Sequence, residues 1–491
     1  MHHALLIDEV LQLIFDHCVA LPKSEPRWTL CQLARCCKAW KDPALDRLWS
    51  RIDGMAPLVS LLQRGEQGTT DNASVSPAFH AYAARVKAIS HPTRFSIPGV
   101  DELATVMPRL EAVTLSFHGC MVPSAWILSD RLRRIAVNIG PARDPQTVID
   151  RSNAAASYLE QATLRALDLQ TLHIRGRMTE SLNCAVAGLT QLRSLTIYAN
   201  CFLTCETLAA VANFPRLQSL AIHASGIPHA DFADALSRSG APCFPALEDL
   251  EIRASGSLLA TVIEHMPARV LTKLRAEVDR SPRGPGYLKG VFEMLSHKMS
   301  ESMSELLIED LTEFEDLDTS LRPHVSPEWY PLSLLAPLAG LKDLRQFAIV
   351  SMLAPALTDA DLERMGKWWP ALQHLNLGTF DVDYLPPDWP VQMTPAALPA
   401  VAKFLPHLES LALPILPIDL VATTGIPPAS ASEAVVPQQT ALRSMTIGDV
   451  HDAAACAPAL VKALLATFPS LRTVECPAHE VTERFAAVQL C

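Results

Sequence analysis

Apolar residues in the first fifty residues recur at helical spacing. In residues 4–21 they fall on one stripe that includes Leu6, Val10 and Ile14. Residues three and four apart share one face of a helix, so this spacing predicts an amphipathic helix. Pro22 ends the predicted helix, because proline cannot continue one.

Two further helices are expected before residue 55. Thr29 is a suitable N-cap for a helix that extends to about Trp40. Asp42 followed by Pro43 is typical of a helix start, since proline is favoured at the first helical position. Three short helices form a domain that is only marginally stable by itself. Any apolar surface that they leave exposed would be a partner site.

A different pattern begins after residue 100. The phrase Pro-x-Leu-x-x-apolar-x-apolar returns along the chain, and each copy predicts a short strand whose apolar residues point to one side. The leucines that open these copies are Leu110, Leu217, Leu247, Leu372, Leu408 and Leu471. Copies without the proline open at Leu132, Leu169, Leu192, Leu344 and Leu442, and weak copies lie near Leu274 and Leu306. Helical patterns separate the copies, so we expect an α/β fold in which a curved parallel sheet lies inside and helices outside.

The N-terminal segment resembles an F-box, most like those of the fungal F-box families. The stretch is LLIDEVLQLIFDHC followed by TLCQLARCCKAWKDPALDRLWSRI. The matching positions are Leu6, Glu9, Val10, Ile14, Phe15, Leu30, Leu33, Ala34, Cys36, Cys37, Lys38, Trp40, Pro43, Ala44, Leu45, Leu48 and Trp49. Ile7 departs from the pattern, because the family usually has proline there.

The resemblance implies a Skp-family adaptor as a partner and, through it, a cullin. The residues expected to bind the adaptor are Leu6, Ile7, Val10, Leu13, Ile14, Leu30, Leu33, Trp40, Leu45, Leu48 and Trp49.

The repeats resemble leucine-rich repeats of an irregular kind. We therefore expect a three-helix F-box domain over residues 1–55, a linker or transition over 56–100, and a leucine-rich-repeat solenoid over 101–485. Residues 381–399 and 414–440 are rich in Pro, Ala, Ser and Thr and are expected to be loop insertions. A doubly wound α/β enzyme would also alternate strands and helices. It would not repeat the proline-marked phrase.

Charge and cysteine content limit the possible functions. The formal net charge is −11 and no cluster of Lys and Arg stands out, which argues against a nucleic-acid binder. Twelve cysteines without regular spacing fit reduced thiols in the cytoplasm or nucleus. The N-terminus does not have the pattern of a signal peptide, and no long apolar run predicts a membrane helix.

No motif predicts chemistry. Glycine-rich phosphate loops, zinc-protease motifs and nucleophile elbows are absent from the sequence. We expect no catalytic residue, no metal and no cofactor, and hence no enzyme. The acidic residues between 301 and 318 are expected to form a solvated helix face.

Recognition is instead expected on the strands. In each copy the third, fifth and seventh positions project from the inner face of the sheet. The residues predicted to bind a target are His173, Arg175, Thr196, Tyr198, His223, Glu251, Arg253, His374 and Asn376. With the resemblance, this favours a substrate receptor of an SCF-type cullin–RING ubiquitin ligase. The alternative is a non-enzymatic repeat scaffold whose N-terminal helices only cap the solenoid.

Overall fold

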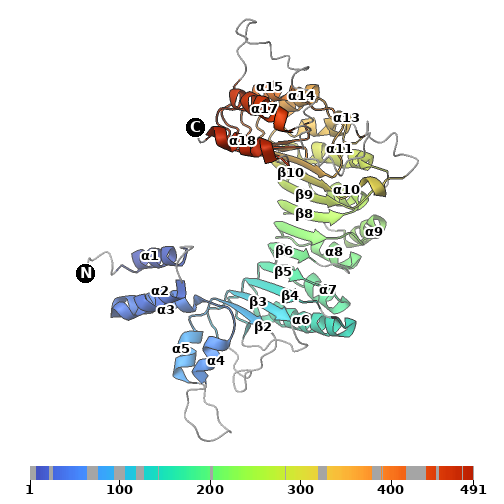
Figure 1. Ribbon diagram of the computed structural model, residues 1–491. Helices are drawn as coiled ribbons and strands as arrows, with labels where there is room; N and C mark the ends of the chain where they lie inside the picture. The colour runs from blue at the N-terminus through green and yellow to red at the C-terminus, as the bar shows by residue number, and fades with distance from the viewer. Residues whose placement is uncertain are drawn as a thin grey trace. The chain divides into compact units, whose positions relative to one another are not determined.

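A computed structural model of the chain divides into two compact units, Met1–Leu217 and Gln218–Cys491 (Figure 1). The residues that it describes are 7–20, 26–62, 76–92, 106–117, 127–141, 143–198, 203–240, 242–281, 283–318, 329–378, 389, 391–415, 438–448, 453–477 and 479–489.

The first unit opens with three helices, α1 (Asp8–Ala20), α2 (Pro26–Cys36) and α3 (Lys38–Ser50). The predicted boundaries of the second and third helices were wrong. α2 starts at Pro26 rather than after Thr29, since proline is well suited to the first turn. Cys37 is the extended residue that separates α2 from α3, and Pro43 lies inside α3 instead of starting it.

Strands of the first unit pair in parallel and in chain order. They are β1 (Arg51–Ile52), β2 (Ala88–Pro92), β3 (Ala112–Phe117), β4 (Arg134–Ile139), β5 (Thr171–Arg175) and β6 (Ser194–Tyr198). The helices that accompany them are α4 (Ala56–Leu62), α5 (Pro77–Ala83), α6 (Pro145–Arg165), α7 (Glu180–Ala187) and α8 (Cys205–Ala212).

The expected linker over 56–100 contains ordered repeat structure. It contributes α4, α5 and β2. The strand β2 was not predicted, because its copy of the repeat opens with Val86 and carries His91 where other copies have an aliphatic residue. Both side chains are nevertheless buried, as are the aliphatic residues at these positions of the neighbouring strand.

The second unit continues the same architecture. Its described strands are β7 (Ser219–His223), β8 (Asp249–Ala254), β9 (Lys273–Val278), β10 (Glu305–Asp310), β11 (Gln346–Ser351), β12 (His374–Asn376), β13 (Ser410–Leu413), β14 (Ser444–Ile447) and β15 (Thr473–Glu475). Neighbours in the chain again pair in parallel. The α/β repeat fold predicted from the sequence is confirmed, and the weak copies at Leu274 and Leu306 belong to β9 and β10.

Helical segments follow most strands of this unit. They are α9 (His229–Ser239), α10 (Gly256–His265), η3 (Pro285–Tyr287), α11 (Leu288–Met299), η4 (Phe314–Asp316), α13 (Leu332–Leu335), η6 (Ala336–Gly340), α14 (Asp359–Trp368), α15 (Ala397–Phe404), α17 (Ala453–Thr467) and α18 (His479–Gln489).

The repeat phrase explains the core. Its apolar positions are buried, as Leu217, Leu220 and Ile222 illustrate with exposed fractions of 0%, 1% and 2%. The aromatic residue before the proline is buried too. Trp369 at the end of α14 is fully buried, and its indole nitrogen donates a 3.0 Å hydrogen bond to the carbonyl of Leu338. Each strand thus packs its apolar side chains against the helical layer.

The expected helix face between residues 301 and 318 is wrong. Residues 305–310 form strand β10, and η4 follows it. Leu306 and Ile308 alternate with more exposed side chains, which is the period of a strand and not of a helix. The acidic residues therefore lie on a strand and on the turn after it.

Parts of the two expected insertions pack against the repeats, while 381–388, 390 and 416–437 lie outside the described residues. Trp389 packs edge-on against Trp329, and its indole nitrogen donates a 3.1 Å hydrogen bond to the carbonyl of Ala354. Gln439 is buried and donates a 2.7 Å hydrogen bond to the carbonyl of Leu408. The ends of these segments are therefore fixed by buried polar contacts.

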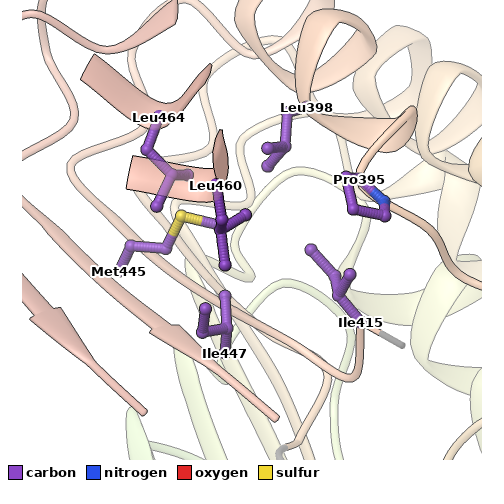
Figure 2. A pocket seen from close by; sticks show the side chains of 7 residues that line it. All are labelled: Pro395, Leu398, Ile415, Met445, Ile447, Leu460 and Leu464. Atoms are coloured by element: carbon purple, nitrogen blue, oxygen red, sulfur yellow. The ribbon is translucent and has the colours of Figure 1, made fainter. Parts of the chain in front are cut away.

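A small apolar cavity lies under the last strands of the second unit (Figure 2). It is lined by Pro395, Leu398, Ile415, Met445, Ile447, Leu460 and Leu464. Its water-accessible space is about 10 Å³. Its apolar wall offers a water molecule no hydrogen-bond partner.

Candidate functional site

The three N-terminal helices share a compact apolar core. Leu11 and Phe15 of α1 are buried with Leu30 of α2 and Ala44 of α3. The Phe15 ring meets Trp40 edge to face, with 6.2 Å between ring centroids. Leu33, Ala34 and Leu48 pack against the same cluster.

A second set of apolar side chains on these helices is left in solvent. Ile7, Leu13 and Ile14 are 48%, 62% and 36% exposed, and Trp28 on α2 is 62% exposed. We call these four residues the exposed apolar face. Large apolar side chains left in solvent on these short helices are candidates for a contact with another protein.

The residues predicted to bind the adaptor therefore do not all lie on one surface. Ile7, Leu13 and Ile14 belong to the exposed apolar face, whereas Leu30 is 2% exposed and belongs to the core. Val10, Leu33, Trp40, Leu45, Leu48 and Trp49 are half-buried, and Leu6 lies outside the described residues. Trp28 was not predicted, because it precedes Thr29, where the second helix was expected to begin.

Polar contacts fix the helices to the repeats. The Arg85 guanidinium, which follows α5, pairs with Asp42 at 2.7 Å and also with Asp46, both on α3. The Trp49 ring packs on Tyr82 of α5 with 4.6 Å between centroids. Trp49 thus holds α3 against the first repeats.

The second candidate surface is formed by the strand positions that face solvent. In the first unit His173, Arg175 and Tyr198 are exposed, whereas Thr196 is 9% exposed. Arg175 lies beside Tyr198 and His173 beside Thr196 across the β5–β6 pair. Burial, and secondarily the charge of Arg134, lowers the pKa of His173.

In the second unit the predicted residues lie on two groups of strands. Glu251 and Arg253 of β8 neighbour Ala221 and His223 of β7. The side chains of Glu251, Arg253 and His223 are half-buried.

His374 and Asn376 lie on β12, away from that group, with His374 exposed. The Asn376 side chain accepts a 2.8 Å hydrogen bond from the amide of Gly378, so it shapes the turn after the strand.

Charges on the face of β8–β10 are largely neutralised within the protein. Arg253 lies 3.8 Å from Glu277 and 3.6 Å from Asp279, and Lys273 pairs with Glu305 at 2.6 Å. Burial raises the pKa of Asp249, and the nearby Lys273 and Arg275 oppose this rise.

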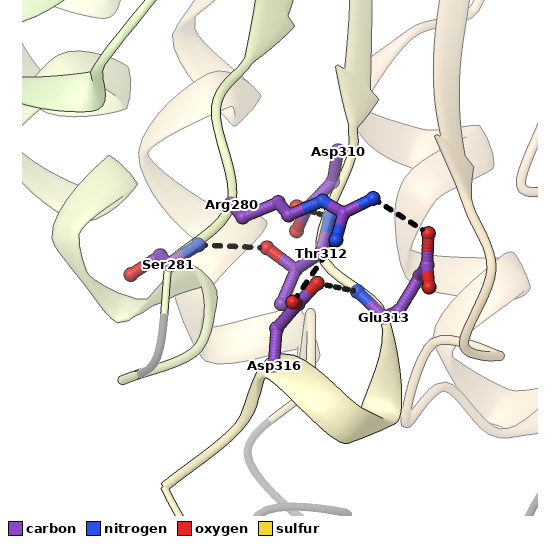
Figure 3. A network of polar contacts seen from close by, with 6 residues as sticks. All are labelled: Arg280, Ser281, Asp310, Thr312, Glu313 and Asp316. Carbon is purple, nitrogen blue, oxygen red and sulfur yellow. Dashed lines mark hydrogen bonds and ion pairs between the residues drawn. The ribbon is translucent and has the colours of Figure 1, made fainter.

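A polar network at the ends of β9 and β10 continues this pattern (Figure 3). Arg280 pairs with Glu313 at 2.9 Å and with Asp316 at 3.1 Å. The amide of Ser281 donates a 3.0 Å hydrogen bond to the Thr312 hydroxyl. The network joins consecutive repeats, and its arginine is paired with two carboxylates.

Among the described residues, no group of His, Cys, Asp and Glu is arranged to hold a metal ion. No helix in the described part of the chain has the length and apolar character needed to cross a membrane.

Comparison with known proteins gives a family match in the N-terminal helices. Residues 8–54 match the F-box-like family. No curated protein sequence matches the chain. A crystal structure of the Rad7–Elc1 complex of yeast is similar at 14% sequence identity and a TM-score of 0.38, covering 78% of this chain and 90% of that chain. The F-box-like match supports an adaptor-binding role for the N-terminal helices.

Proposed function

We propose that this protein is the substrate-receptor subunit of an SCF-type cullin–RING ubiquitin ligase, working in the cytoplasm or nucleus. The F-box-like helices dock a Skp-family adaptor and through it a cullin, while the repeats hold a target protein. The receptor itself carries out no catalysis, and ubiquitin transfer belongs to other subunits. One observation carries the proposal: the F-box-like segment 8–54 contains three of the four residues of the exposed apolar face, Leu13, Ile14 and Trp28.

The exposed apolar face suits a stable partner. Burying a leucine or isoleucine side chain contributes about 1.5–3 kcal/mol relative to leaving it in water. Leu13 and Ile14 contribute little to the stability of the three helices, since the core of these helices is filled by Leu11 and Phe15. Both side chains can therefore be buried against a partner without a change in the packing of the domain.

Co-purification with a Skp-family adaptor tests the proposal. We expect Leu13→Asp combined with Trp28→Ala to abolish capture of the adaptor while the thermal unfolding of the chain stays unchanged. Leu167→Asp is the matched control, because Leu167 is a 74% exposed leucine elsewhere in the same unit. Failure of the native chain to capture the adaptor would favour the alternative, a repeat scaffold capped by its N-terminal helices, and capture that survives the double substitution would contradict the exposed apolar face as the contact.

A further inference from the structure

Unpaired basic side chains collect on the strands of the first unit. We define the basic strand face as six exposed residues: Arg51, Arg134 and Arg175 on the strands, and Lys87, Arg133 and Arg193 just before strands. Among the described residues, none of the six has an ion-pair partner within 4.0 Å. This differs from β8–β10, where Arg253 and Lys273 are already paired with carboxylates.

Carboxylates are scarce on this face, and an exposed one, Glu111, lies in the row between Lys87 and Arg133. The third, fifth and seventh positions of β2–β6 carry none; they are Ala88, Ser90, Pro92, Ala112, Thr114, Ser116, Arg134, Ala136, Asn138, Thr171, His173, Arg175, Ser194, Thr196 and Tyr198. Asp53, just beyond β1, is paired with Arg27 at 2.8 Å. A chain whose net charge is −11 thus keeps one sheet face basic.

The basic residues also have a regular spacing. The residues just before the strands follow one another across the sheet, and each is joined to the next by a backbone hydrogen bond of 2.8–2.9 Å. In order they are Lys87, Glu111, Arg133, Gln170 and Arg193. Alternate strands therefore carry a cation at this edge. Neighbouring strands are about 4.8 Å apart, so alternate cations stand roughly 10 Å apart.

That spacing matches an extended peptide. Residues three apart in an extended chain are separated by about 10 Å. We propose that the basic strand face binds an acidic segment of the target protein, extended across the strands, with carboxylates at every third residue facing Lys87, Arg133 and Arg193. The inference rests on the proposed function, in which the repeats hold the target.

Small side chains leave room for such a segment. Ala88, Ala112 and Ser194 lie in the row that also contains Arg51 and Arg134. A polypeptide can approach this row closely, and the basic side chains would contact its carboxylates. A nucleic-acid duplex presents a charge about every 1.7 Å, which six cations on a protein of net charge −11 do not match.

Fluorescence anisotropy with the full-length chain tests the inference. The probe is a fluorescein-labelled peptide of repeated Glu-Ser-Gly, and the reference is the same peptide with glutamine in place of glutamate. We expect the acidic peptide to bind with an affinity that falls as salt is added. Combined Arg133→Glu and Arg193→Glu should weaken binding roughly tenfold, because two attractive contacts become repulsive.

Arg345→Glu is the matched control. Arg345 is exposed and occupies the same position before β11, where its neighbours in the row are Ser304 and Gln373. It should change the affinity less than twofold. Equal loss in the control and the double variant, absence of binding to the acidic peptide, or tighter binding of oligodeoxythymidine or anionic lipid vesicles would overturn the inference.

Two further readouts separate the claims. A peptide with its glutamates gathered in one block should bind more weakly than the evenly spaced one, and equal affinity would contradict the proposed register. Adaptor capture should be unchanged by Arg133→Glu and Arg193→Glu. Retained adaptor capture with no peptide binding refutes this inference alone, whereas peptide binding without adaptor capture refutes the ligase role.

Discussion

The Tyr330 hydroxyl donates a 3.0 Å hydrogen bond to Oδ2 of Asp310, and both side chains are buried. The other carboxylate oxygen of Asp310 accepts a 3.0 Å hydrogen bond from the amide of Thr312. Burial nevertheless outweighs these bonds and raises the pKa of Asp310. The end of β10 is therefore stabilised by hydrogen bonds to a carboxylate whose ionised form is disfavoured by burial.

Asp310→Asn should separate the charge of this group from its hydrogen bonds. The folded protein holds the Asp310 proton more tightly than the unfolded chain, so stability falls as pH rises from the ordinary aspartate range through the raised pKa. The amide can still accept from Thr312 and donate to the Tyr330 oxygen. We expect the variant to gain stability relative to the native chain above this window but not below it, as measured by urea unfolding at several pH values.

Asp310→Ala is the companion to that variant. It leaves the Tyr330 hydroxyl and the Thr312 amide without their acceptor, at about 1–3 kcal/mol for each group that stays buried and unpaired. The free energy of unfolding should fall at every pH. Equal stability of the alanine and asparagine variants would show that these hydrogen bonds contribute nothing.

Phe15→Ala and Leu13→Asp should affect the N-terminal helices in different ways. Phe15 is fully buried, so its truncation costs about 3–5 kcal/mol and unfolds a small domain. Leu13 is 62% exposed and its replacement should leave stability unchanged. Limited proteolysis checks this difference, since Phe15→Ala alone should open the helices to cleavage.

Leu464→Ala should destabilise the second unit by about 2–5 kcal/mol, because it removes buried apolar atoms and enlarges an apolar cavity. Leu464 is fully buried on α17 and lines that cavity. Val488→Ala on α18 is the control, since Val488 is 43% exposed. Denaturant unfolding measures both, and a similar loss in the two variants would contradict the assignment of Leu464 to the core.

The His173 side chain should report on its neighbours. Arg134→Ala should raise the pKa of His173 only partly, because burial is the larger cause of the lowered value. Addition of the acidic peptide should raise it further, since a carboxylate favours the charged imidazole. Histidine NMR titration measures both shifts. A pKa that falls on addition of the peptide would place the carboxylates away from this side chain.

The sequence alone predicted the repeat strands well, since the apolar positions of Leu-x-x-Leu-x-Leu fix which side chains are buried. It predicted less well which apolar side chains of the first helix are buried. The adaptor-binding residues expected on that helix include Leu13 and not Leu11, and only packing against the other helices decides that Leu11 is buried and Leu13 exposed.

Ion pairs between neighbouring strands were equally hard to predict from the sequence. The contact between Arg253 and Glu277 depends on β9 lying beside β8, and the β9 copy is one of the weak ones. Its prediction would have required the parallel register of both strands. The local pattern does not contain that register.

The passage from α3 to β1 has a mechanical consequence. α3 ends at Ser50 and β1 begins at Arg51, without a spare residue between them. Arg85 and Trp49 fasten the same helix to the repeats. A flexible tether would let a cargo sample many distances from the adaptor. Under the proposed function, the direct join and these two contacts of α3 would limit the distances from the adaptor that a cargo held on the first repeats could reach, so only certain lysines of that cargo would come within reach of ubiquitin transfer.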